Sequence, residues 1–210
     1  MYFVKTPNSI QRWFSDYIWR FSTSKKELFL TFDDGPNPEI TTFVLDILAK
    51  YNAKATFFCV GENAIKHPKI FKRILAEGHK IGNHTQNHLN GWKTENTNYI
   101  ANVGLAEKSF NTVIPNFKTK LFRPPYGKIK KKQATALQNK GYEIIMWTVL
   151  SGDFDINCSP KKCYNNIIKN AKSGNIIVFH DSRKAKKNMQ ETLVNILAYY
   201  SNKGFKFKLL

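Results

Sequence analysis

Residues 28–38 read LFLTFDDGPNP. The first five residues are apolar or β-branched, which is typical of a buried strand. Two adjacent carboxylates, Asp33 and Asp34, follow where this strand gives way to a Gly-Pro turn. Neighbouring side chains on a strand point to opposite faces, but a turn can bring both into one pocket. The stretch therefore predicts either ordinary Asx-turn chemistry or a functional pair of carboxylates at the carboxyl end of a strand.

Strands and helices alternate outward from this stretch to the end of the chain. Expected strands cover residues 28–32, 55–60, 79–83, 120–123, 142–149, 175–179 and 205–209, and expected helices cover residues 38–51, 62–77, 99–113, 129–139, 160–172 and 188–201. About seven β/α units with short connections predict a single α/β domain, a distorted (β/α)7-type barrel. In such folds the chemistry gathers at the carboxyl ends of the strands.

Composition adds a strong positive charge. The chain carries 33 Lys and Arg residues against 15 Asp and Glu residues, a formal net charge of +18. This balance favours anionic partners, but the lysines are scattered, which is typical of a solvated basic surface. No nucleic-acid motif accompanies them, so we expect no nucleic-acid partner. Cys59, Cys158 and Cys163 give no disulfide framework and no recognised zinc spacing, and we expect reduced thiols.

Residues 1–26 precede the first expected strand and form an N-terminal extension that we expect to pack on the body, residues 27–210. Charged residues interrupt every apolar stretch here: Lys5, Arg12, Asp16 and Arg20. The extension therefore does not predict a secretory signal, which needs about 7–15 apolar residues. No stretch of the chain reaches the roughly 18 apolar residues of a membrane span. We expect a cytoplasmic location, with unconventional export or peripheral membrane association as the alternatives.

A pair of histidines follows the third expected strand, where residues 84–88 read HTQNH. Histidines four residues apart fall on one side of a helical turn, where both imidazoles can bind one metal ion. Two histidines and one carboxylate leave open positions on zinc for water and substrate, as in hydrolytic metal sites. An isolated pair of this kind is more often a chance feature of the surface. This pair, however, stands at a strand end, as the two aspartates do.

Two more strands end in polar groups. The fourth expected strand runs into RPPYG (123–127), in which two prolines fix the backbone and a nearby N–H can donate to an oxyanion. The sixth runs into His180. Each feature alone is consistent with a plain turn or a structural histidine. Four such groups at the ends of four strands indicate one active site.

In these blocks the sequence resembles the polysaccharide deacetylases with the NodB homology domain, carbohydrate esterase family 4. The blocks TFDDGP (31–36) and RPPYG (123–127) match the family letter for letter. HTQNH (84–88) matches the family's H-(S/T)-x-x-H, and VFH (178–180) matches its L-x-H. The resemblance spans about residues 27–209.

The resemblance implies a role for each block. It implies that Asp33 is the general base, kept ionised by Arg123, and that His180 is the general acid. It implies one divalent metal, Zn²⁺ first and Co²⁺ or another divalent ion otherwise, on three ligands: Asp34, His84 and His88. It also implies that the Tyr126 N–H donates to the oxyanion and that the substrate contacts Pro124, Pro125, Tyr126, Phe154 and Val178.

The fourth block departs from the family pattern, which is an Asp, two variable residues and then Asp-Trp. Residues 147–155 read WTVLSGDFD, so Leu150 replaces the first Asp and Phe154 replaces the Trp. Asp153 remains, and we expect it to keep His180 in its charged form. A phenylalanine can still wall an acetyl pocket, so we expect activity to survive with an altered substrate shape and pH optimum.

Together, the blocks predict a metal-dependent hydrolase that removes N-acetyl groups from a glycan containing N-acetylglucosamine, such as peptidoglycan or chitin-type oligomers. Acetate and a glucosamine unit are the expected products. Two alternatives stay open at this stage. One is a non-catalytic glycan-binding relic of an enzyme. The other is a deacylase or amidohydrolase acting on an O-acetyl group or a small amide.

Overall fold

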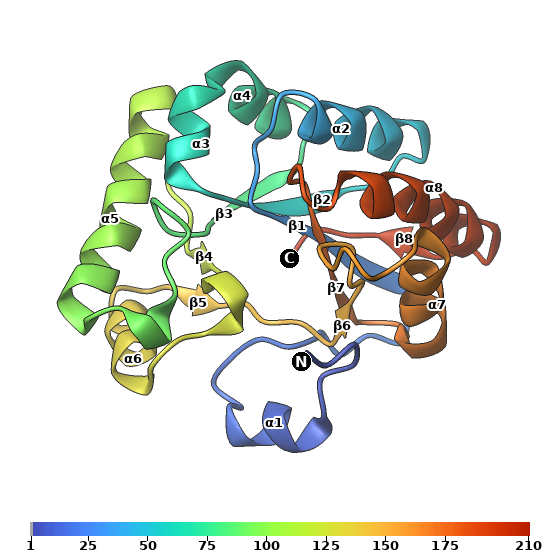
Figure 1. Ribbon diagram of the computed structural model, residues 1–210, viewed down its shortest axis with the longest axis horizontal. Coiled ribbons are helices and arrows are strands. Elements are labelled where there is room, and N and C mark those ends of the chain that lie inside the picture. Colours follow the sequence, from blue (N-terminus) through green and yellow to red (C-terminus); the bar gives the residue numbers. More distant parts are fainter. Residues whose placement is uncertain (1) are drawn as a thin grey trace.

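The computed structural model describes residues 2–210 and contains a parallel sheet with the strand order β5-β4-β3-β2-β1-β7-β6, to which β8 adds by pairing with β1. The strands are β1 (Glu27–Asp33), β2 (Ala55–Cys59), β3 (Lys80–Asn83), β4 (Leu121–Phe122), β5 (Glu143–Ile144), β6 (Val149–Leu150), β7 (Ile176–His180) and β8 (Lys206–Phe207). Figure 1 shows the strands in the middle of the molecule with most helices around the outside. The prediction of a single distorted (β/α)7-type domain is confirmed.

Except for the first, which precedes β1, the helices lie in connections between consecutive strands, as parallel pairing requires. They are α1 (Asn8–Trp13), α2 (Ile40–Lys50), α3 (Gly61–Lys66), α4 (Pro68–Ala76), α5 (Asn96–Val113), α6 (Lys131–Asn139), α7 (Pro160–Asn170) and α8 (Lys186–Asn202). Two short 3-10 turns, Gly91–Lys93 and Pro125–Gly127, lie in the connections before α5 and α6. Among residues 2–210, none of the helices has the length and the apolar run that crossing a bilayer requires.

The two faces of β1 explain why the sheet has both a core and a site. Leu28, Leu30 and Phe32 alternate along one face and are fully buried in the main hydrophobic core with residues of α2 and α8. The intervening residues Thr31 and Asp33 point to the other face, inside the curl of the sheet. Phe29 packs on that side with Phe58, Ile145 and Ile176, whereas Thr31 and Asp33 make it polar toward the carboxyl end of the strand, where it opens.

The helix expected over residues 62–77 is wrong as a single element, because it is two helices that meet at His67 and Pro68. The backbone of His67 has φ −130° and ψ 57°, outside the helical region. Proline disfavours helical geometry in the residue before it but fits the first turn of a new helix. α3 therefore ends at Lys66, and Pro68 starts α4.

The single strand expected over residues 142–149 is also wrong. It is two short strands, β5 and β6, that lie at opposite ends of the sheet order. The chain between them crosses the open side of the curled sheet, so the Ile145 N–H bonds to β4 while the Thr148 N–H bonds to β7. The buried guanidinium of Arg123 donates hydrogen bonds to the carbonyl oxygens of Ile145 and Met146, at 3.2 and 3.1 Å. The Arg123 side chain thus supplies the hydrogen bonds that a neighbouring strand would otherwise supply to this segment.

The N-terminal residues lie along the same crossing. Lys5 pairs with Val149 and Ile18 pairs with Ile145 through isolated β-bridges. Figure 1 shows α1 apart from the other helices, beside the segment between β5 and β6. The residues expected to form an extension therefore cover the seam where the sheet does not close. The boundary at residue 26 stays a prediction.

Candidate active site

A cleft of about 620 Å³ lies at the carboxyl ends of the strands. Its lining combines the expected catalytic groups with apolar side chains: Tyr2, Asp33, Asp34, His84, His88, Tyr126, Gly127, Lys128, Trp147, Leu150, Phe154, Val178, His180, Ser182 and Lys184. Residues from β1, β3, β6, β7 and the turn after β4 meet here because parallel strands end at the same edge of the sheet.

Asp33 and Arg123 form a buried ion pair at the floor of the cleft. Arg123 Nη1 lies 2.7 Å from Asp33 Oδ1 and donates to Thr31 Oγ1 at 2.6 Å. The guanidinium is fully buried and stacks on the Phe58 ring, with 4.1 Å between its central carbon and the ring centroid. Because a buried charge is costly unless it is paired, the Arg123 guanidinium and the Asp33 carboxylate hold each other in place at the floor of the cleft.

Asp34, His84 and His88 bring one donor atom each to a common point, within 4.8 Å of one another. Nε2 of His88 lies 3.1 Å from Asp34 Oδ1, and Nε2 of His84 lies 3.7 Å from the same oxygen. The three residues come from the ends of β1 and β3, which are separated in the sheet by β2. The three groups that the sequence named as ligands are thus brought together.

The chemistry of these donors fits a divalent cation. Asp34 Oδ1 is buried, and the imidazole nitrogens of His84 and His88 are the polar atoms that face it. Nδ1 of His84 is hydrogen-bonded to the Arg123 carbonyl oxygen at 2.8 Å. The lone pair on Nε2 is therefore the one that faces the cleft. Burial lowers the pKa of His84 to about 4, which keeps the imidazole neutral and able to coordinate. The imidazoles of His84 and His88 and the Asp34 carboxylate together form a candidate divalent-metal site.

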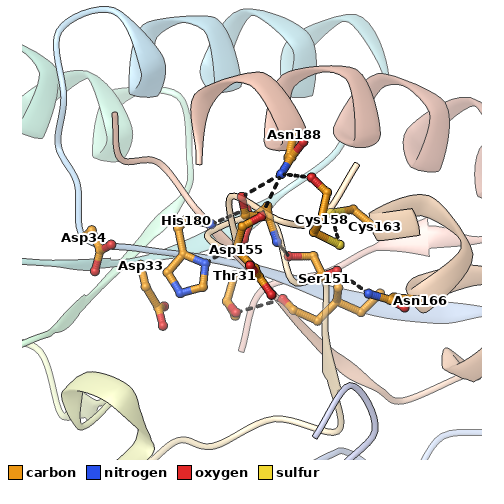
Figure 2. A network of polar contacts seen from close by, with 12 residues as sticks. Thr31, Asp33, Asp34, Ser151, Asp155, Cys158, Cys163, Asn166, His180 and Asn188 are labelled. Carbon is orange, nitrogen blue, oxygen red and sulfur yellow. Dashed lines mark hydrogen bonds and ion pairs between the residues drawn. The ribbon is translucent and has the colours of Figure 1, made fainter. Parts of the chain in front are cut away.

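His180 ends β7 beside Asp33 of β1 in the parallel register. Its Nδ1 lies 2.8 Å from Asp153 Oδ1, and its backbone N–H donates to Asp153 Oδ2 at 2.8 Å. Burial alone would lower the pKa of His180, but the Asp153 carboxylate raises it to about 9. Figure 2 shows the imidazole pointing to the side where Asp33 and Asp34 lie. The ring is therefore a proton donor facing the cleft.

The backbone of the site is strained. Within residues 2–210, six residues other than glycine have a positive φ, and four belong to the site blocks: Asp34, Thr85, His88 and Tyr126. The other two are asparagines, the residue type that tolerates this region best. Such conformations persist only where the surroundings over-determine them, and they gather at functional sites. The sequence blocks carry no signal of this strain.

Tyr126 shows what the prolines before it do. Pro124 and Pro125 are buried and are not among the residues that line the cleft. They shape the turn instead, in which the Gly127 N–H donates to Pro124 and the Lys128 N–H to Pro125. Within residues 2–210 the Tyr126 N–H donates no backbone hydrogen bond. It is free for an oxyanion, while the Tyr126 ring packs against His88 with 4.6 Å between centroids.

The divergent fourth block still builds one wall of the cleft. Phe154 packs edge-on against His180, with 5.0 Å between ring centroids, and Leu150 and Val178 line the same wall. Sequence reasoning missed Tyr2, which comes from the far end of the chain. Its ring lies 5.0 Å from that of Phe154, and its hydroxyl donates to Asp155 at 3.0 Å. No local pattern around Tyr2 indicates this contact.

Sequence reasoning also missed the role of Asp181, which stands directly after His180. Its Oδ1 accepts the Gly35 N–H at 2.9 Å, and its Oδ2 accepts the Thr41 hydroxyl. A Cβ at Gly35 would lie 2.0 Å from Asp181 Oδ2, so only glycine fits there. Burial raises the pKa of Asp181 to about 7. Asp181 ties the turn after Asp34 to β7 and thereby fixes the two aspartates relative to His180.

Known proteins share this arrangement of sequence and fold. The polysaccharide deacetylase family profile matches residues 21–145. A peptidoglycan-N-acetylglucosamine deacetylase of Bacillus cereus (strain ATCC 14579) is 34% identical over 190 residues, which cover 90% of this chain and 88% of the relative. A chitooligosaccharide deacetylase of Azorhizobium caulinodans is 31% identical over 164 residues, 77% of each protein.

A solved structure agrees with these relatives. It is a peptidoglycan N-acetylglucosamine deacetylase in complex with 4-naphthalen-1-yl-N-oxidanyl-benzamide, and it superposes with a TM-score of 0.89 at 35% identity, covering 98% of this chain and 95% of that chain. The resemblance drawn from the four sequence blocks is thereby confirmed, and the chain belongs to the polysaccharide deacetylase family.

Proposed function

We propose that this chain hydrolyses the acetamido group of N-acetylglucosamine units in a glycan, with Zn²⁺ as the resident metal. The observation that carries the proposal is that three groups of side chains meet at one cleft. These are the Asp33–Arg123 pair, the Asp34/His84/His88 group and the Asp153–His180 pair. The similar proteins are named for substrates that share N-acetylglucosamine, either in peptidoglycan or in chitooligosaccharides.

The donor set favours zinc within the wider class of divalent ions. Two imidazoles and one carboxylate, with positions left open, are typical of zinc hydrolases. When bound, a Zn²⁺ ion lowers the pKa of water and polarises a carbonyl oxygen. Asp34, His84 and His88 would hold it.

The remaining chemistry belongs to the side chains and the backbone of this chain. Asp33, paired with Arg123, accepts the proton of the attacking water. The free Tyr126 N–H donates to the oxygen that gains charge as the acetyl carbon becomes tetrahedral. His180, protonated against Asp153, donates its proton to the departing sugar nitrogen. Acetate and a free amine leave the cleft.

Phe154, Leu150 and Val178 form the apolar wall against which an acetyl methyl can pack. Each of these side chains lies in the same cleft as the acid–base groups. A wall of this kind favours a short acyl group and excludes competing water near the reacting carbon.

The test measures acetate release from N-acetylglucosamine oligomers, peptidoglycan, acetylated xylan and a small acetyl amide. Each is assayed as purified, after chelation, and after Zn²⁺ or Co²⁺ is added back. We expect acetate from the N-acetylglucosamine substrates, loss after chelation, and recovery with metal. Release from xylan alone would favour an O-acetyl esterase. Binding without release by the metal-loaded protein would favour a non-catalytic relic.

A further inference from the structure

We propose that a groove between α1 and the two turns Gly91–Lys93 and Pro125–Gly127 binds the sugar units that adjoin the reacting one. This aromatic groove encloses about 470 Å³ and is lined by Ile10, Trp13, Phe14, Tyr17, Trp19, Trp92, Gly127, Ile129 and Met146. The inference rests on the proposed function for the identity of the ligand. It adds a binding surface to which residues 10–19 contribute five of the nine lining residues, and Gly127 is the lining residue that belongs to a family sequence block.

The exposure of the aromatic rings is the first observation. Trp13 is 85% exposed and Trp92 is 60% exposed, although large aromatic side chains normally contribute to cores and interfaces. Phe14 adds a third exposed ring on the same groove. Several large apolar side chains gathered on one surface mark a binding site more often than isolated ones do.

The groove continues from the catalytic cleft. Gly127 lines both hollows. Its φ is +66°, and a Cβ at this position would lie 2.7 Å from Trp147, so no side chain can stand there. The adjacent Lys128 lines the cleft and reaches back over Trp92, with 5.3 Å between Nζ and the ring centroid. A polymer that leaves the cleft on this side meets the Trp92 ring next.

Two of the indole rings in the groove are held in place by hydrogen bonds before any ligand arrives. The Trp92 indole N–H donates to the Ile129 carbonyl at 3.2 Å, and the Trp19 indole N–H donates to the Phe14 carbonyl at 2.8 Å. The second bond ties the end of α1 to Trp19, which is buried in one hydrophobic cluster with Tyr142 and Met146 of the body. Rings fixed in this way lose little conformational entropy when a ligand stacks on them.

Polar groups border the groove. Tyr17 and Trp19 also line a second hollow together with Asn8, Gln11, Arg12, Ser15, Ile18 and Arg20. A pyranose ring has an apolar C–H face and an edge of hydroxyl groups. An exposed indole beside amide, hydroxyl and guanidinium groups offers a partner to both parts. A lipid surface would use the apolar rings but not their continuity with the cleft, so the observations favour a glycan.

The experiment compares the dimer and the hexamer of N-acetylglucosamine as substrates of the metal-loaded enzyme. For the wild type we expect kcat/KM to be higher for the hexamer. Trp13→Ala and Trp92→Ala should lower the hexamer-to-dimer ratio by roughly fivefold to tenfold, the effect expected of truncating an aromatic anchor. Leu105→Ala is the matched control, because Leu105 is 47% exposed on α5 and does not line the groove. Its ratio should equal that of the wild type.

A binding measurement separates this inference from the proposed function. Hexamer binding is followed by calorimetry, and sedimentation with phosphatidylglycerol vesicles is measured in parallel. Trp13-dependent hexamer binding without acetate release supports the groove and rejects the proposed activity. Acetate release with the same ratio in wild type and Trp13→Ala rejects the groove alone. Trp13-dependent vesicle binding without hexamer binding also overturns the groove proposal and assigns the rings to a membrane.

Discussion

His84 and His180 both end strands at one cleft and both face carboxylates, yet their hydrogen-bond partners differ. The Nδ1 of His84 meets a backbone carbonyl, whereas the Nδ1 of His180 meets the Asp153 carboxylate. Burial dominates at His84 and lowers its pKa to about 4, while the carboxylate raises the pKa of His180 to about 9. A neutral partner leaves a lone pair for a metal, and a charged partner keeps a proton for a leaving group.

The largest expected effect comes from removing His84, the histidine whose Nδ1 has a neutral partner. His84→Ala removes one of three ligands, so metal binding should weaken by more than the roughly 10–100-fold typical of outer-shell changes. Turnover should fall to background for the same reason. Metal analysis and acetate release measure the two losses. His67→Ala is the control, since His67 lies at the junction of α3 and α4 and does not line the cleft. Equal metal content in both variants would reject the site.

Removing His180, the histidine whose Nδ1 has a charged partner, should have the next largest effect. His180→Ala removes the proton donor, and such groups typically contribute about 10²–10⁴-fold in rate. The variant should keep its metal, because His180 ends a different strand and lies outside the ligand group. Steady-state kinetics and metal content are measured on the same preparation. Loss of metal in this variant would make His180 a ligand and end the contrast with His84.

The contrast between the two histidines also shows what sequence can reveal. The blocks at residues 31–36 and 84–88 predicted the ligands through their resemblance to the family, and the structure brings them together because the carboxyl ends of β1 and β3 lie at one edge of a parallel sheet. The resemblance also predicted that Asp153 keeps His180 charged, and the structure brings the two side chains together. Residue types could not predict that Nδ1 of His84 meets the Arg123 carbonyl, because that contact joins residues 39 positions apart and depends on how the strands pack. The helix break at Pro68, in contrast, was readable from the proline rule.

The contribution of Tyr2 was beyond the reach of sequence patterns for another reason. Its contacts with Phe154 and Asp155 span more than 150 positions in the chain. Residues 2–26 reach the cleft because the sheet leaves a seam that they cover. Tertiary closure of this kind has no local periodicity. The same is true of the positive φ of Asp34 and Tyr126, which the surrounding packing imposes.

Asp153→Asn sharpens the comparison, because it gives His180 a neutral partner as His84 has. A raised pKa means that the active, protonated form persists until pH rises through about 9. Without the carboxylate the pKa falls, so the basic limb of the rate–pH profile should move to lower pH. The double variant with His180→Ala should be no slower than His180→Ala alone, since both changes act on one proton. Rate profiles of the three variants test this, and additive losses would mean that Asp153 acts elsewhere.

The smallest expected effects come from replacing two asparagines. One supports the turn between the metal histidines, and the other supports the loop that carries Asp153. Asn102 of α5 accepts the backbone N–H groups of Gln86 and Asn87, inside the turn between the metal histidines. Asn188 of α8 donates to the carbonyls of Asp153 and Asp155 at 3.3 Å and of Cys158 at 2.9 Å. Both asparagines are 8% exposed, and replacing either with alanine removes hydrogen bonds to buried or part-buried backbone groups, at a cost of about 1–3 kcal/mol.

The two alanine variants are therefore matched in stability loss and differ only in which histidine they disturb. Each should lower Tm by a few degrees, about 2–4 °C per kcal/mol for a chain of this size. Asn102→Ala should weaken metal binding severalfold and leave the basic limb of the rate–pH profile in place. Asn188→Ala should keep the metal affinity and shift that limb to lower pH, because the loop no longer fixes Asp153 against His180. If each variant changed both the metal affinity and the basic limb of the rate–pH profile, the metal site and the His180–Asp153 pair would be coupled. That result would contradict the prediction that the metal ligand and the acid act independently.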